Sequence, residues 1–190
     1  MRGQAHTLEA VVAALLLLTS LVFALQLTAV TPLSASTSSQ HIENQQRAVG
    51  SGVLAGAAET GALKEAVLYW DNSSASFHNS NANGEYTDPP ENRLGRMLER
   101  SFDRRGIAYN VYFRFSNGTG SERTTYIYSG APSDNAVTAT YFVTLTDDDY
   151  LYNADGSRTN IQLRRSSYFM PNQDSNVYNT VRVEVVAWRI

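Results

Sequence analysis

The N-terminal apolar segment is the feature that most constrains this chain. Residues 10–25 are mostly aliphatic and uncharged, and the apolar stretch extends through Gln26 and Thr28 to Val30. That is about the 20 residues that a helix needs to cross a bilayer. The segment is apolar on every side of a helix, unlike a helix with one face in water. It therefore predicts a membrane-spanning helix rather than a buried helix of a soluble core.

The charges that flank this segment predict its orientation. Arg2 is the only cation before the apolar stretch. Cationic residues favour the cytoplasmic side of a span, so we expect a cytoplasmic N-terminus. The prediction is a single-pass protein of the cell membrane whose C-terminal domain is extracellular.

A short motif precedes the apolar segment. The run Arg2-Gly3-Gln4 is followed by the acid Glu9 and then by the long apolar helix. This arrangement resembles the class III leader of archaeal type IV pilins and archaeal flagellins, and the chain is similar to haloarchaeal pilin-like proteins of unassigned role. The resemblance implies that a peptidase cuts after Gly3 and that a glutamate stands fifth in the mature chain. Here a cut after Gly3 makes Glu9 the sixth residue, whereas a cut after Gln4 makes it the fifth, so two processing points stay open.

Glu9 has two interpretations. The resemblance implies that its carboxylate pairs with the freed α-amine of a neighbouring subunit, which would offset the cost of an acid at the edge of an apolar helix. Alternatively, Thr7 caps the helix and Glu9 lies in the first turn, where negative charge offsets the helix dipole.

Composition limits the chemistry and the partners of the chain. It has no cysteine, so it offers neither disulfides nor a thiolate metal site. Its net charge of -3 comes without a basic stripe, which argues against a nucleic-acid partner. The sequons that begin at Asn72 and Asn117 are candidate glycosylation sites, usable only outside the cytoplasm.

The length of 190 residues suits one membrane helix and one modest extracellular domain. We expect a leader and span over 1–31, an extension of the helix over 32–70 and a β-rich head over 71–190. Pro32 lies at the boundary between the span and the extension, and we expect the helix to continue through it. Four glycines weaken the extension, each by about 1 kcal/mol relative to alanine: Gly50, Gly52, Gly56 and Gly61. Residues 71–92 form a long polar loop, which suggests exposure and a binding role.

The sequence predicts that the head contains one helix followed by strands. Residues 91–105 predict an amphipathic helix that Gly106 ends. After it, apolar and polar residues alternate with the period of half-buried antiparallel strands. The last strand is the clearest, with inward positions at Val177, Val181, Val183, Val185 and Ala187. The fold class is therefore α+β, with the apolar face of the sheet packed on helices.

Catalytic motifs are not recognisable. The three histidines share no metal-ligand spacing, and we find no catalytic triad order and no phosphate-binding glycine loop. We therefore predict no enzyme and no cofactor. One acidic cluster offers oxygens to calcium, or else forms a solvated hairpin turn around Asp155-Gly156; its members are Asp147, Asp149, Asn153 and Asp155.

The sequence thus predicts a pilin-like, membrane-anchored protein, a minor or accessory subunit of a type IV pilus-like assembly. Its partners would be the membrane and other pilin-like subunits or an assembly platform. The main alternative is a single-pass anchored surface domain that does not polymerise and acts as an adhesin, sensor or partner-binding module. A third is a secreted domain released near Val22-Phe23-Ala24, and an extracellular hydrolase is the fourth.

Overall fold

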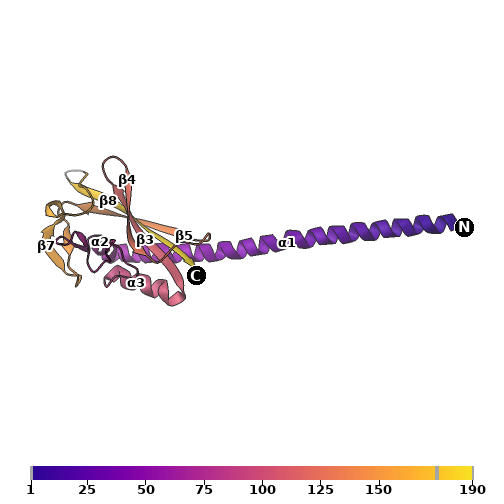
Figure 1. The fold of residues 1–190 in the computed structure, drawn as a ribbon, viewed down its shortest axis with the longest axis horizontal. Helices are drawn as coiled ribbons and strands as arrows, with labels where there is room; N and C mark the ends of the chain where they lie inside the picture. Colours follow the sequence, from indigo (N-terminus) through magenta and orange to yellow (C-terminus); the bar gives the residue numbers. More distant parts are fainter. Residues whose placement is uncertain (1, 174–175, 190) are drawn as a thin grey trace. The chain divides into compact units, whose positions relative to one another are not determined.

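The computed structural model describes residues 2–173 and 176–189, and within them the side chains of all residues except 2–5 and 27–39. The chain divides into two compact units, Met1–Ile42 and Glu43–Ile190 (Figure 1). We call the second unit the head. The head therefore includes the end of the N-terminal helix and begins earlier in the chain than the boundary at 71 that we predicted.

The long N-terminal helix is α1 (Arg2–Glu59). It passes through Pro32 without ending, as predicted. We expected helix as far as residue 70, but α1 ends at Glu59 because Gly61 adopts a left-handed conformation with φ +76°. A short helix, α2 (Ala62–Val67), follows this break, and Trp70 then begins a strand.

The head core begins on the last turns of α1. Val53, Leu54 and Ala57 are buried there. A Cβ added to Gly50 would lie 2.9 Å from Cβ of Ala139, so the helix backbone lies very close to strand β5 (Val137–Thr146) at this point. The glycine that weakens the helix therefore also allows its contact with the sheet.

A four-stranded antiparallel sheet forms most of the head. Its strand order is β4-β3-β8-β5, with β3 (Ile107–Ser116), β4 (Ser121–Tyr128) and β8 (Val177–Arg189) beside β5. Figure 1 shows this sheet beside the head portion of α1 and the short helices. The predicted α+β class is confirmed.

The last strand, β8, follows the predicted alternation except at its start. Val181, Val183 and Val185 are buried. Val177 was predicted to face inward but is 38% exposed, because the register of β5 and β8 shifts between Leu145 and Thr146 and breaks the alternation.

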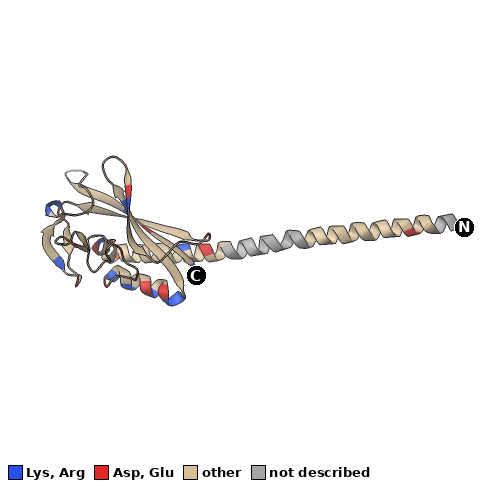
Figure 2. Cartoon of the chain, in the orientation of Figure 1, with Lys and Arg blue, Asp and Glu red and all other residues tan. Residues whose placement is uncertain are grey.

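The helix predicted over 91–105 is present as α3 (Arg93–Ser101) followed by the 3₁₀ turn η1 (Asp103–Arg105). Asn92 is its N-cap, and the Asn92 Oδ1 accepts a hydrogen bond of 2.8 Å from the Gly95 N–H. Figure 2 shows acidic and basic residues gathered along this helix. Its opposite face is buried in the core, as expected of an amphipathic helix.

The segment 71–92 is more ordered than a polar loop. Two short strands, β1 (Trp70–Asp71) and β2 (Ser76–Phe77), pair with each other at its start. Phe77 and Tyr86 are buried among the aromatic side chains of the core. The expectation of an exposed loop is therefore wrong for these two aromatic residues, which anchor the segment to the sheet.

A small hairpin completes the head. Strands β6 (Tyr150–Tyr152) and β7 (Arg158–Gln162) pair antiparallel, and the 3₁₀ turn η2 (Leu163–Arg165) follows them. Gly156 has φ +80°, and its N–H donates to the Asn153 carbonyl at 2.9 Å. The hairpin predicted around Asp155-Gly156 is confirmed.

Candidate functional site

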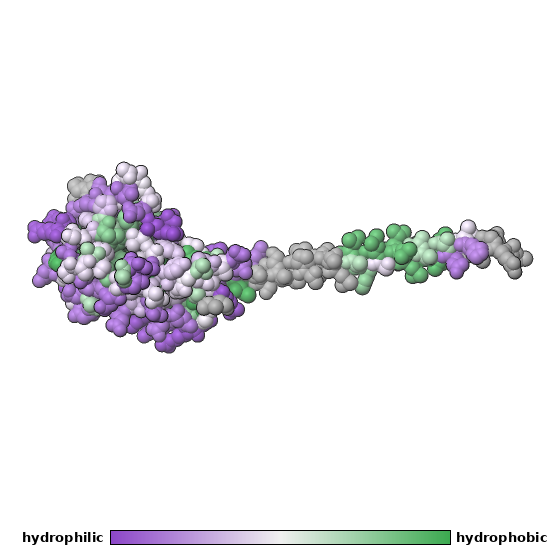
Figure 3. Space-filling model, in the orientation of Figure 1, coloured by the Kyte–Doolittle hydropathy of each residue, from purple (hydrophilic) through white to green (hydrophobic). Residues whose placement is uncertain are grey.

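The apolar segment of α1 is the first candidate site. His6–Gln26 is 21 residues long with a hydropathy of 2.5, enough by length and composition to cross a membrane. None of its side chains is buried within the chain. Figure 3 shows the resulting apolar surface along the described part of this helix. So large a continuous apolar surface calls for lipid or for other helices around it.

Two hydroxyl side chains inside this segment are satisfied by the helix itself. Thr19 Oγ1 donates to the Leu15 carbonyl at 2.7 Å, and Ser20 Oγ donates to the Leu17 carbonyl at 2.9 Å. A polar group in hydrocarbon is costly unless it is hydrogen-bonded. These two residues therefore do not prevent the segment from lying in lipid.

The residues of the proposed leader are placed at the start of the same helix. Glu9 Oε2 lies 3.8 Å from His6 Nδ1, and both side chains are exposed. Because α1 begins at Arg2, it has no acid in its first turn, and Thr7 lies inside the helix. The interpretation in which Thr7 caps the helix is therefore wrong. Gly3 and Gln4, the predicted processing residues, lie outside the residues whose side chains are described.

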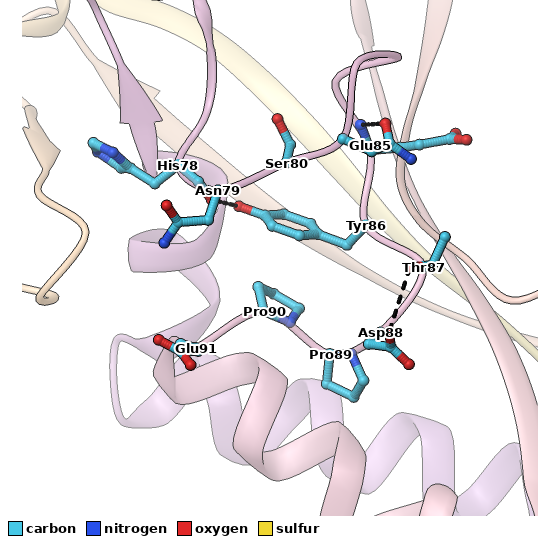
Figure 4. Close-up of a pocket in the computed structure, with 11 residues that line it drawn as sticks. His78, Asn79, Ser80, Glu85, Tyr86, Thr87, Asp88, Pro89, Pro90 and Glu91 are labelled. Atoms are coloured by element: carbon cyan, nitrogen blue, oxygen red, sulfur yellow. Dashed lines mark hydrogen bonds between the residues drawn. The ribbon is translucent and has the colours of Figure 1, made fainter.

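A pocket on the head is the second candidate site. Its volume is about 440 Å³, and residues 78–81 and 85–91 line it (Figure 4). Acidic side chains contribute to the lining at Glu85, Asp88 and Glu91. The amides, hydroxyls and carboxylates of this lining suit a polar ligand that donates hydrogen bonds.

Tyr86 fixes the shape of this pocket. Its hydroxyl donates to the His78 carbonyl across the pocket, and its ring is buried (Figure 4). Burial raises the pKa of the Tyr86 hydroxyl far above its usual range, and the nearby Tyr69 raises it further. The group therefore stays protonated and acts as a fixed hydrogen-bond donor. The His78 ring faces away from this bond, with Nε2 2.8 Å from the Tyr152 carbonyl.

The acidic cluster suggested as a calcium site is split among separate local contacts. Asp149 Oδ2 lies 2.7 Å from Lys64 Nζ and accepts the Thr146 N–H. Asp147 Oδ1 accepts from the Asn172 amide at 2.8 Å. In the described residues, no group of three or more His, Asp or Glu side chains is placed to hold a metal ion.

The other two members of that cluster belong to the β6–β7 turn. Asp155 Oδ1 accepts the Ser157 N–H at 2.8 Å, and Asn153 Nδ2 donates to Ser157 Oγ at 3.0 Å. Two hydrogen bonds from Ser157 lower the pKa of Asp155, and the one from its side chain has a larger effect than the one from its backbone. These contacts are those of a closed turn.

The two glycosylation candidates differ in their surroundings. Asn117 lies in the exposed β3–β4 turn, and its Oδ1 accepts from Thr119 Oγ1 at 3.1 Å, within the same sequon. Asn72 is partly buried, and its Oδ1 accepts the Ser167 N–H at 2.6 Å. The Asn117 side chain is therefore the more accessible of the two acceptors.

Sequence reasoning missed two buried charged groups. Glu65 is 3% exposed and lies 3.4 Å from Arg93. Glu184 is buried between Arg114 at 2.9 Å and Arg182 at 2.7 Å on the face of the sheet opposite the core. Alternation along β8 predicts that Arg182 and Glu184 share the face away from the core, but only the strand order shows that Arg114 of β3 lies beside them.

Comparison with known proteins adds a family to this description. No curated protein and no solved structure matches the chain. A family model matches residues 2–187, a range that includes both the apolar segment and nearly all of the head. The chain therefore belongs to DUF7288, a family of unknown function.

Proposed function

We propose that this protein is a membrane-anchored, extracytoplasmic, pilin-like protein and a minor or accessory subunit of a type IV pilus-like assembly. The N-terminus is cytoplasmic and the head extracellular in this proposal. One observation carries it: the helix α1 bears an exposed apolar segment, His6–Gln26, near its start and buried core residues of the head near its end. Because the family model covers both parts, the helix and the head are features of the same family.

The proposed mechanism is assembly without catalysis. The apolar segment lies in lipid before assembly and then exchanges lipid for packing against helices of other pilin-like subunits or of an assembly platform. Processing at Gly3 or Gln4 frees an α-amine close to the span. A neighbouring subunit's Glu9, whose carboxylate is exposed in the single chain, can pair with that amine.

Competition between variants in filaments tests this pairing. We expect Glu9→Gln to leave membrane insertion intact and to reduce incorporation into filaments sharply. Glu59→Gln is the matched control, because Glu59 is an exposed acid at the other end of the same helix. Equal incorporation of Glu9→Gln and the wild type would remove the pairing from the proposal.

The N-terminus of the native protein distinguishes the proposal from its alternatives. Intact mass and N-terminal sequencing should give a start at Gln4 or Ala5. A chain that begins at Met1 or Arg2 would contradict leader processing, and a start near Leu25 would indicate a secreted domain instead.

The head pocket favours a second candidate function. A cavity of about 440 Å³ around Tyr86, with both polar and apolar groups in its lining, suits a single-pass anchored module that binds a partner and does not polymerise. In that case Glu9→Gln would have no effect on the function of the protein. Tyr86→Phe would remove the donor to His78 and alter ligand binding by the head.

A further inference from the structure

The two edges of the head sheet differ in their protection. At the β4 edge, the Tyr86 N–H donates to the Tyr126 carbonyl at 2.9 Å, and the Tyr128 N–H donates to the Tyr86 carbonyl at 2.8 Å. The same strand carries the charges of Glu122 and Arg123. Added backbone pairing and charged side chains are the usual ways in which proteins prevent an edge strand from pairing with another chain.

The β5 edge has none of these features. Its sequence from Val137 to Thr146 contains no charged residue, proline or glycine. Within the described residues, β5 pairs with β8 alone. Thr146 is the one residue of β5 with a further backbone hydrogen bond among them, as acceptor from Asp149. The outward N–H and C=O groups over 137–145 are thus available to another strand.

The side chains of β5 also favour pairing with another strand. Phe142 is 62% exposed, and its neighbour Tyr141 is 38% exposed. The register with β8 places Phe142 beside Arg182 and Thr140 beside Glu184, on the face of the sheet that lies away from the core. An exposed aromatic side chain in the middle of a ten-residue uncharged strand gains contact area when a second strand is added.

We propose that β5 pairs antiparallel with β5 of a second copy of this protein, about a two-fold axis at Phe142. In this register Phe142 lies opposite its counterpart, and Thr140 lies opposite Thr144. Directly opposed residues point to the same face of a sheet, so the core-facing and outward rows of both copies continue across the contact. Because the strand is uncharged, self-pairing brings no like charges together.

The direction of β5 decides which copies can meet. Gly50 lies beside Ala139, and Lys64 pairs with Asp149, so the chain from α1 to α2 runs in the same direction as β5. A two-fold axis perpendicular to the sheet reverses that direction in the second copy. The head portions of the two α1 helices therefore run in opposite directions. The proposed contact joins the heads of copies that are anchored in two different surfaces. It rests on the anchoring part of the proposed function and not on filament assembly.

Proteoliposomes that carry the full chain with outward heads test this contact. We expect wild-type vesicles to cluster, as measured by light scattering, and Phe142→Glu vesicles to lose clustering because two glutamates meet at the axis. Ser121→Glu, a charge at an exposed position of the β4 edge, is the matched control and should cluster like the wild type. Flotation of the vesicles with bound protein reports anchoring separately.

Complementary charges give the decisive result. Phe142→Lys vesicles should not cluster alone, but a mixture of Phe142→Lys and Phe142→Glu vesicles should cluster again. Tryptophan emission checks the fold of each variant, and Phe142→Thr, which extends the threonine row of the strand, replaces any charged variant that fails to fold and should weaken clustering. Anchored wild-type vesicles that stay dispersed, variants that cluster as the wild type does, or folded charged variants whose mixture stays dispersed would each overturn the proposal.

Discussion

Gly95 has no room for a side chain, so Gly95→Ala should destabilise the head strongly. A Cβ at this position would lie 1.9 Å from the Pro90 carbonyl oxygen and 2.9 Å from the Pro90 carbonyl carbon. Both neighbours are backbone atoms, which cannot rotate away as a side chain can. The loop before α3 must therefore move, and that movement disturbs the hydrogen bonds at the start of the helix.

The size of the destabilisation by Gly95→Ala can be estimated from the contacts that the added Cβ would disturb. Overpacking a well-packed site costs about 1 to 3 kcal/mol. The Asn92 cap, which accepts the Gly95 N–H, is worth about 1 kcal/mol. The bond from the Asn92 N–H to the Pro90 carbonyl adds about 1 kcal/mol. Alanine regains about 1 kcal/mol of helix propensity. The net loss of unfolding free energy is thus about 2 to 4 kcal/mol.

Gly52→Ala is the control for this prediction. Gly52 is an exposed glycine of α1, and a Cβ there would have no heavy atom within 4 Å. Alanine at this position should stabilise the head by about 0.5 to 1 kcal/mol through helix propensity alone.

Urea unfolding of the full chain in detergent micelles measures both effects. Trp70 and Trp188 are the two tryptophans of the chain and both are buried in the head, so their emission reports on the head rather than on the span. A Gly95→Ala variant as stable as the wild type would refute the packing argument. So would a Gly52→Ala variant destabilised as much as Gly95→Ala.

Further predictions concern the span, the sequons and one surface carboxylate. Replacing Leu16 and Leu17 by arginine should abolish membrane association in a flotation assay, because each mid-span charge costs about 2.5 to 3.5 kcal/mol; unchanged flotation would contradict the anchor. If the head is glycosylated, mass spectrometry of its peptides should find sugar on Asn117 rather than on the partly buried Asn72, and the reverse occupancy would contradict this reading. Hydrogen bonds from the side chain and backbone of Ser73, and from the side chain of Ser74, lower the pKa of Asp71 to about 2. A carboxyl whose pKa is lowered by folding stabilises the protein above its usual pKa and loses this effect as pH falls toward 2. The difference in unfolding midpoint between wild type and Asp71→Asn should therefore shrink on acidification, and a constant difference would count against the shift.

The apolar segment and the strands of the sheet could be predicted because their signals are local. Hydropathy over His6–Gln26 depends on composition alone. The alternation along β3, β5 and β8 records which face of each strand is buried, whatever its neighbours are. Strand order and the pocket carry no such local signal. The pocket depends on Tyr86, whose backbone bonds to Tyr126 and Tyr128 place a polar stretch of chain against the edge of the sheet.

The glycines of α1 show why the remaining features required a structure. By propensity they are equivalent, each costing about 1 kcal/mol in a helix interior. In the fold they differ: Gly50 lies against Ala139 of β5, a Cβ at Gly52 would meet no heavy atom within 4 Å, and Gly61, just after α1, ends the helix through a left-handed conformation. What a glycine does is decided by the atom opposite its missing side chain and by its backbone angle. For Gly50, that atom belongs to a strand almost ninety residues later in the chain, so only the folded head shows that Gly50 is a packing contact while Gly52 is replaceable.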